Sequence, residues 1–242
     1  MKAKVIANLP IAAFCAILGG CADDSKTIGT EIKQIEALRT RLNQIEQQVA
    51  IARDASEIKK LQRTYGYYLD RGKADDMADL FTDSNPVAGY ESGDFVGKDS
   101  IRTAFRYLGR GNQLPTGRMM THMQVQPVVH VAADGKTALG RFRAVAMTAR
   151  AGEARIQEGP YESTYVKEDG VWKIQNLHWY ETFGVPYFGG WPMIKPPPSE
   201  RPDPAEIARR AGIPKPDRPE KTATWPQAAV APYHYKNPVS DR

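Results

Sequence analysis

Asp70 is a carboxylate at an electrostatically unfavourable place in a predicted helix. Residues 58–69 have helical periodicity, and Asp70 falls in the last turn of the helix that they predict. The helix dipole is negative at this end and does not favour an anion. Tyr65 and Tyr68 make the neighbouring helix face aromatic. Asp70 is therefore either a solvated partner of Arg71 or part of a site beside that face.

Histidines are the other candidates for acid–base chemistry, because imidazole titrates near neutral pH. His122 lies in a strand-like run, on a mixed face with Met120 and Gln124. A lone strand histidine can equally be a structural residue. In a later strand, alternation predicts one face made of Trp172, Ile174, Asn176, His178 and Tyr180. His178 would there bind either a ligand or a backbone carbonyl in the core.

Several other classes of protein do not fit the sequence. The four histidines are scattered without an HExxH motif, which argues against a metal site. No serine or cysteine motif suggests a covalent nucleophile, and no glycine-rich phosphate loop is present. The net charge of +5 is small and dispersed, which argues against nucleic-acid binding.

Three helices are predicted to position these residues. Asp54 and Glu57 have capping-box spacing, which predicts that a helix begins there. Gly72 suits the left-handed position after its end, so a break is expected at Arg71-Gly72, with a short second helix ending near Phe81. Residues 98–108 predict the third helix.

Four strand-like runs follow, near residues 118–132, 136–150, 154–168 and 171–184. The dipeptides Asp134-Gly135 and Asp169-Gly170 predict tight turns within the first and last pairs, and Gly152 marks the middle turn. Helices followed by a long meander of strands indicate an α+β fold.

A family resemblance rests on four stretches in order: Tyr65…Leu69-Asp70-Arg71-Gly72…Met77-Ala78-Asp79-Leu80-Phe81; Phe95-Val96-Gly97-Lys98-Asp99-Ser100-Ile101; Thr121-His122-Met123; and Tyr161-Glu162…Tyr165-Val166-Lys167-Glu168-Asp169-Gly170-Val171-Trp172. This pattern resembles the SnoaL-like group of the nuclear transport factor 2-like superfamily, the group of scytalone dehydratase and hexachlorocyclohexane dehydrochlorinase. The resemblance covers roughly residues 54–184. It implies a cone in which a curved antiparallel sheet surrounds three helices.

The resemblance also implies a catalytic pair. Asp70 and His122 match the helix aspartate and strand histidine of that group, so the Asp70 carboxylate is expected within hydrogen-bond reach of a His122 ring nitrogen. Neutral His122 would remove a substrate proton, and Asp70 would stabilise the imidazolium. The expected substrate-binding residues are Tyr65, Tyr68, Tyr161 and His178. No cofactor is implied.

The front of the chain resembles a bacterial lipoprotein signal. Lys2 and Lys4 precede a short apolar stretch, and Leu18-Gly19-Gly20-Cys21 resembles a lipoprotein box. Residues 1–20 are expected to be removed and Cys21 lipidated; plain secretory cleavage is the alternative. We expect a protein anchored in the cell envelope, at the outer membrane facing the periplasm if the organism is Gram-negative.

Residues 21–53 carry a heptad pattern. Ile28, Ile35, Leu42 and Val49 repeat at seven, and Leu38, Ile45 and Ala52 lie three residues further on. A long helix is expected, which either pairs between chains in a homo-oligomer or docks on its own domain.

The tail, residues 189–242, is rich in proline and cannot build a core of its own. One short helix is predicted at 203–212, with Pro204 in its first turn and Gly212 after its end. Its aromatic residues and those just before it are expected to anchor the tail on the domain or on a second subunit; they are Phe183, Tyr187, Phe188, Trp191, Trp225, Tyr233 and Tyr235.

The sequence thus predicts a signal peptide (1–20), a coiled-coil-like helix (21–53), a SnoaL-like α+β domain (54–188) and a proline-rich tail (189–242). The expected function is a cofactor-free lyase or isomerase that acts on a small hydrophobic ring-containing molecule. The alternative is a non-catalytic ligand-binding or assembly module anchored to the membrane.

Overall fold

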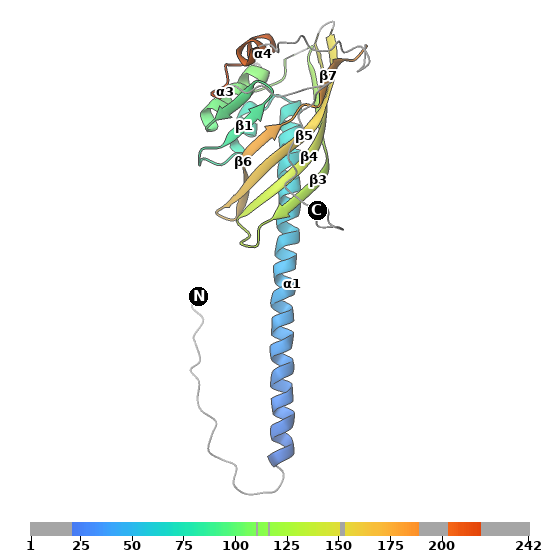
Figure 1. Ribbon diagram of the computed structural model, residues 1–242, viewed down its shortest axis with the longest axis vertical. Helices are drawn as coiled ribbons and strands as arrows, with labels where there is room; N and C mark the ends of the chain where they lie inside the picture. The colour runs from blue at the N-terminus through green and yellow to red at the C-terminus, as the bar shows by residue number, and fades with distance from the viewer. Residues whose placement is uncertain (1–20, 110, 116, 151–152, 189–202, 219–242) are drawn as a thin grey trace. The chain divides into compact units, whose positions relative to one another are not determined.

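The computed structural model describes residues 21–109, 111–115, 117–150, 153–188 and 203–218 (Figure 1). The chain divides into two compact units at Val49/Ala50. The predicted signal at 1–20, the turn at Gly152, and Trp191, Trp225, Tyr233 and Tyr235 lie outside the described residues. Within the described part, no helix is long and apolar enough to cross a membrane.

The first helix, α1 (Cys21–Asp70), is continuous, so the predicted helix start at Asp54 is wrong. Asp54 is not a cap: its Oδ1 accepts hydrogen bonds from Lys167 Nζ (2.6 Å) and from Trp172 Nε1 (3.0 Å). The predicted end is confirmed, because Gly72 adopts a φ of +64° and its N–H donates to the Leu69 carbonyl (3.1 Å).

In the first unit, α1 presents its heptad residues to solvent. Among the large apolar side chains of residues 28–49, the exposed fractions of Ile28, Ile35, Leu38, Leu42, Ile45 and Val49 run from 47% to 65%.

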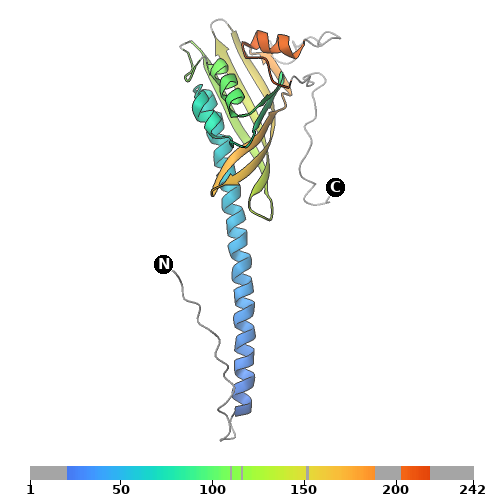
Figure 2. The same cartoon turned by 90° about the vertical axis from the view of Figure 1, so that its left-hand side faces the viewer.

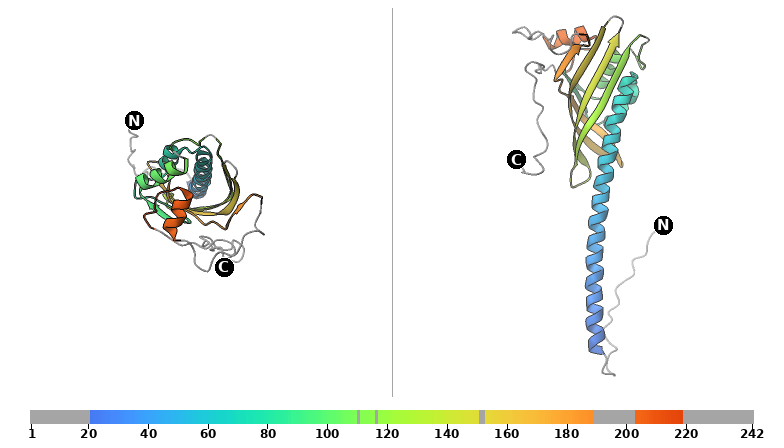
Figure 3. Two further views of the ribbon diagram at one scale, coloured as in Figure 1. Left: turned by 90° about the horizontal axis from the view of Figure 1, so that it is seen from above. Right: turned by 90° about the vertical axis from the view of Figure 1, so that its right-hand side faces the viewer.

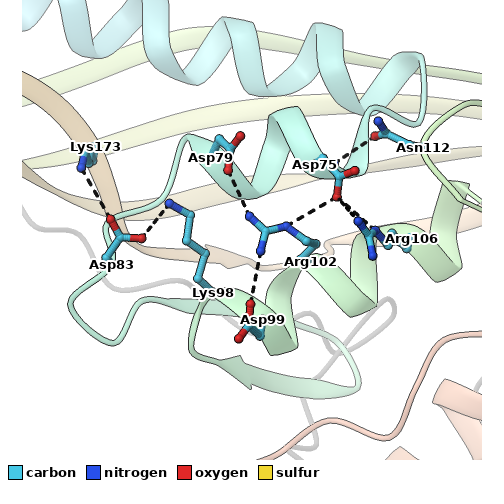
Figure 4. Close-up of polar contacts among 9 residues, drawn as sticks. All are labelled: Asp75, Asp79, Asp83, Lys98, Asp99, Arg102, Arg106, Asn112 and Lys173. Carbon is cyan, nitrogen blue, oxygen red and sulfur yellow. Dashed lines mark hydrogen bonds and ion pairs between the residues drawn. The ribbon is translucent and has the colours of Figure 1, made fainter.

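Two short helices follow in the second unit, α2 (Ala74–Asp79) and α3 (Lys98–Gly109). Figure 4 shows the ion pairs that join them. Arg102 contacts Asp79 (3.1 Å) and Asp75 (3.5 Å), and Arg106 contacts Asp75 (2.7 Å). These pairs lie near the surface and contribute little each. Burial of the apolar helix faces, which include Met77 and Phe105, supplies most of the stabilisation.

One sheet contains all the strands of the described residues: β1 (Val87–Tyr90), β2 (Gly93–Val96), β3 (Met119–Val131), β4 (Thr137–Arg150), β5 (Glu153–Glu168), β6 (Val171–Trp179) and β7 (Phe183–Pro186). Its order is β2-β1-β6-β5-β4-β3, and β7 pairs with β5. The predicted tight turns are confirmed, with positive φ at Gly135, Asp169 and Gly170. The sheet is mixed, because β1 runs parallel to β6, a pairing that the sequence analysis did not predict.

The strands curve round α3 and the last turns of α1, as Figures 2 and 3 show. The core fills the concave side. Ile58 and Tyr65 of α1 are fully buried there, and Leu61 and Tyr68 pack against them more loosely. The predicted apolar helix face is therefore confirmed.

The tail contributes helix α4 (Pro204–Ala211), as predicted. Asp203 caps it by accepting from the Ala205 N–H (3.0 Å), and Gly212 ends it with a φ of +69°. Beyond it, Arg218 and Asp94 exchange main-chain hydrogen bonds (2.7 and 3.1 Å). The tail therefore lies against β2. Tyr187 and Phe188 are 64% and 92% exposed, so they do not pack on this domain, and their contact with a second subunit stays a prediction.

Candidate active site

A cavity of about 750 Å³ opens on the concave side of the sheet. Its lining has an apolar part, which includes Leu69, Phe95, Leu108, Met120, Trp179 and Ile213, and a charged part, which includes Glu91, Arg118, Arg150, Glu153 and Arg155. A cavity of this size suits a small molecule with an apolar body and polar substituents.

Three tyrosines form a hydroxyl cluster in this cavity. Tyr65 and Tyr90 share a hydrogen bond between their hydroxyls (2.9 Å), and the Tyr161 ring lies edge-on to Tyr65 (5.9 Å between centroids). Burial raises the pKa of Tyr65 to about 12 and holds the pKa values of Tyr90 and Tyr161 well above the ordinary value. All three are therefore neutral and act as hydrogen-bonding groups rather than bases.

His122 lines the same cavity from β3. Its Nδ1 is buried and has no hydrogen-bond partner among the described residues, and its ring lies edge-on to Trp179 (6.5 Å between centroids). Burial lowers the pKa of His122 to about 4. The imidazole is therefore neutral at physiological pH and is not committed to a structural hydrogen bond, as a base must be.

Asp70 does not pair with the His122 ring, and the predicted contact is wrong. Its Oδ1 accepts a hydrogen bond from the main-chain N–H of His122 (2.6 Å). Burial raises the pKa of the Asp70 carboxyl, while this hydrogen bond and Arg71 oppose the rise. Asp70 is also not among the residues that line the cavity. It therefore fixes the backbone of β3 at His122 rather than the charge of the imidazole.

Gly66 explains how α1 comes so close to β3. A Cβ at Gly66 would lie 2.9 Å from the His122 carbonyl oxygen and 2.9 Å from Gln124 Cγ. A larger residue would push the helix away from the strand. The glycine thus permits the approach that brings Asp70 to the main chain of His122.

Glu181 is a site residue that the sequence analysis missed. It is 9% exposed, lines the cavity just after β6, and accepts a hydrogen bond from Gln157 Nε2 (2.6 Å). Burial, with the negative charge of Glu91, raises the pKa of Glu181 to about 7, against the opposing effects of Gln157, Arg155 and Trp179. The one available signal was a glutamate set among aromatic residues at the end of a strand.

The other predicted substrate-binding residues divide into two groups. Tyr65 and Tyr161 line the cavity, whereas Tyr68 and His178 do not. The His178 ring instead packs on Tyr180 (4.2 Å), with its Nδ1 3.8 Å from Asp94.

A bulge explains why the face predicted for His178 is wrong. Tyr165 pairs with Ile174 and Thr164 pairs with Asn176, which leaves Gln175 as an extra residue in β6. Residues after it therefore exchange faces, so Leu177 and Trp179 are buried.

Cys21 is the first residue of α1, and its side chain is outside the described residues, so its lipidation stays a prediction. Among the described residues, no group of three or more histidine, cysteine or acidic side chains could hold a metal ion.

Residues 50–178 match the family model of a SnoaL-like domain. The chain belongs to the SnoaL-like domain family. The similar solved structures include two with TM-scores above 0.5. A putative scytalone dehydratase from Novosphingobium aromaticivorans is 21% identical with a TM-score of 0.51, covering 58% of this chain and 91% of that one. LinA is 15% identical with a TM-score of 0.51, covering 63% of this chain and 99% of that one. No curated protein matched significantly.

These similarities confirm the predicted family and the nuclear transport factor 2-like fold of this SnoaL-like domain. At such identities, the two solved structures show the fold alone. The chemistry of the cavity has to be argued from its own residues.

Proposed function

We propose that this protein is a cofactor-free lyase or isomerase that acts on a small, hydrophobic, ring-containing molecule, with His122 as the base. The observation that carries the proposal is a neutral imidazole that lines the cavity and whose Nδ1 has no hydrogen-bond partner among the described residues. A histidine with a structural role would be expected to bond a neighbouring group.

The chemistry begins with removal of a proton from a substrate carbon. His122 takes the proton, and the electron pair forms a double bond as a leaving group departs, or forms an enolate that is reprotonated elsewhere. The neutral hydroxyls of Tyr65, Tyr90 and Tyr161 can hold a substrate oxygen. Because Tyr65 and Tyr161 are buried, hydrogen bonds to their hydroxyls are stronger than in water.

Hydrogen–deuterium exchange tests the base before the substrate is known, because both reactions start by breaking a C–H bond. The wild-type protein should speed the uptake of deuterium from D₂O at the α-carbon of cyclic ketones such as tetralones and cyclohexenones, followed by NMR. His122→Ala should lower this rate by about 100-fold or more. The matched control is His130→Ala, a change at an exposed position of the same strand.

Equal exchange rates in the wild type and in His122→Ala would reject His122 as the base. No exchange by the wild type with any ketone of the panel would favour the alternative, a non-catalytic ligand-binding or assembly module. The Asp70 contact favours this alternative, because the carboxylate does not support the imidazole charge.

The proposal places the protein in the cell envelope. Lipidation at Cys21 would hold it at a membrane, which is the outer membrane facing the periplasm if the organism is Gram-negative. The exposed heptad residues of α1 would pair in a homo-oligomer, because such a seam is typical of helices that associate.

A further inference from the structure

Glu181 is a buried carboxyl group that the base mechanism does not use. Its Oε2 accepts from Gln157, and its Oε1 would lie 2.5 Å from a Cβ placed on Gly184. The absence of a side chain at Gly184 therefore leaves room for the carboxyl group. Glu181 also lines the cavity that His122 lines.

Burial and the negative charge of Glu91 disfavour the Glu181 anion more than its other neighbours favour it. Gln157 and Trp179 are neutral donors, and Glu91 is a like charge. Arg155 is a cation that favours the Glu181 anion, but its Nη2 donates to the Gly184 carbonyl (3.1 Å). A carboxyl in such surroundings keeps its proton to a higher pH than usual, and a neutral carboxylic acid can donate a hydrogen bond.

Trp179 connects this acid to the rest of the cavity. Its indole hydrogen-bonds to Glu181. Its ring packs on the Tyr161 ring (4.7 Å between centroids) and lies edge-on to the His122 ring (6.5 Å between centroids). A small ligand beside Trp179 would thus have Glu181 as an acid and His122 as a base in the same cavity.

We propose that Glu181 is the proton donor of the cavity and that, in its neutral form, it binds an oxygen of a hydroxyl- or carbonyl-bearing ring compound. The proposal rests on the proposed function for the role of His122, but the donor site stands on its own geometry. The ligand class is a ring compound whose oxygen carries or gains negative charge, because a neutral carboxylic acid donates its strongest hydrogen bond to such an oxygen.

The two groups divide an elimination as follows. His122 takes the proton from carbon, the C–H electron pair becomes the second bond of the alkene, and the C–O bond breaks. The departing oxygen takes the Glu181 proton and leaves as water. The imidazolium then loses one proton and the carboxylate gains one, by exchange with solvent. In an isomerisation, Glu181 donates a hydrogen bond to the enolate oxygen, and the imidazolium returns its proton to another carbon.

Pentafluorophenol tests the donor directly, because this phenol is mostly an anion near neutral pH and its oxyanion needs a donor. Its affinity for the full protein is measured by fluorine NMR and calorimetry on both sides of pH 7. The dissociation constant of the wild type should rise tenfold or more as the pH passes upward through about 7, where Glu181 loses its proton.

Three variants make the test specific. Glu181→Gln keeps a donor of the same shape that does not titrate, so its affinity should stay constant through this range. Glu181→Met has no donor, and its affinity should be about tenfold lower than that of the wild type at the lower pH. The control Glu57→Gln, the same change at an exposed position outside the cavity lining, should keep the wild-type profile.

Wild-type affinity in Glu181→Met, or the same pH profile in the wild type and in Glu181→Gln, would overturn the donor site. If Glu181→Met does not fold, as judged by circular dichroism, the comparison with Glu181→Gln decides. The phenol also separates the two proposals. If the wild type shows the expected pH dependence of phenol binding but does not exchange the ketones, then His122 is rejected as the base and Glu181 remains the donor.

Discussion

The Asp70 carboxylate holds the main chain of His122 and not its imidazole. The bond from the His122 N–H to Oδ1 is 2.6 Å long, and Asp70 is not among the residues that line the cavity. Asp70 therefore acts as a positioning residue, because it fixes where β3 passes α1 and so where the imidazole lies.

Asp70→Asn should consequently have a small effect. The asparagine oxygen can still accept from the His122 N–H, so the exchange rate of the ketones and the free energy of unfolding should stay close to wild type. Asp70→Ala leaves that partly buried N–H without its acceptor and should cost about 1–3 kcal/mol in urea unfolding. A loss of exchange by orders of magnitude in Asp70→Asn, without a loss of stability, would restore the charge-based role expected from the sequence.

His122 and Glu181 give stability opposite dependences on pH. Burial lowers the pKa of His122 from 6.5 to about 4, so the unfolded chain binds the extra proton as pH falls below 6.5 and stability is lost. Burial raises the pKa of Glu181 from 4.5 to about 7, so the folded chain keeps the extra proton and stability is lost as pH rises from 4.5 to about 7. Between 4.5 and 6.5 the two slopes oppose each other.

Single variants should expose each slope. The stability of the wild type relative to His122→Gln should rise by about 3 kcal/mol between the two pKa values of His122. Relative to Glu181→Gln, it should fall by a similar amount as the pH rises to about 7. Urea unfolding at a series of pH values measures both, with His130→Gln as the control at an exposed position. Flat difference curves would mean that neither group has a shifted pKa.

Local chemistry was enough to predict most of the fold. Gly72, Asp169-Gly170, and Pro204 with Gly212 predicted a helix end, a turn and a short helix that the structure contains. The prediction that a helix begins at Asp54 was wrong, because residues with capping spacing can also lie within a continuous helix. Nothing between the heptad segment and Asp54 interrupts helical period, and the distant Lys167 and Trp172 use the carboxylate instead.

The site was less predictable, because it depends on contacts between distant strands. One extra residue, Gln175, moves His178 off the face that alternation predicts. The raised pKa of Glu181 depends on Glu91 and on burial, neither of which is local in sequence. His122 was found through the family resemblance, whereas its missing ring partner is visible only in three dimensions.

Asp54 should matter for stability. Burial by itself raises its pKa, but the hydrogen bonds from Lys167 and Trp172 outweigh this and lower it. Asp54→Ala leaves the indole N–H and a partly buried ammonium without their acceptor, and should cost about 3 kcal/mol in urea unfolding. Asp76→Ala, a change at an exposed carboxylate of α2, should stay within about 0.5 kcal/mol of wild type. Equal stability in the two variants would show that the buried cluster is dispensable.

Lipidation of Cys21 should determine whether the protein is bound to the membrane. The Leu18-Gly-Gly-Cys21 sequence predicts lipidation, so Cys21→Ser should move the protein from the membrane pellet to the soluble fraction. Cys15→Ser, a change within the predicted signal, should leave the protein membrane-bound. A Cys21→Ser protein that still pellets and carries no lipid would end the anchor proposal.

The heptad seam of α1 should determine the oligomeric state. Leu42 is 54% exposed and Ile45 is 47% exposed, and a second copy of the helix would remove both from water. Leu42→Glu places a charge in that seam and should lower the mass measured by light scattering, because a buried unpaired charge is costly. Gln47→Glu adds the same charge on another side of the helix and should leave the mass unchanged. Deletion of residues 22–53 should give the monomer. An unchanged number of subunits after this deletion would assign oligomerisation to the SnoaL-like domain.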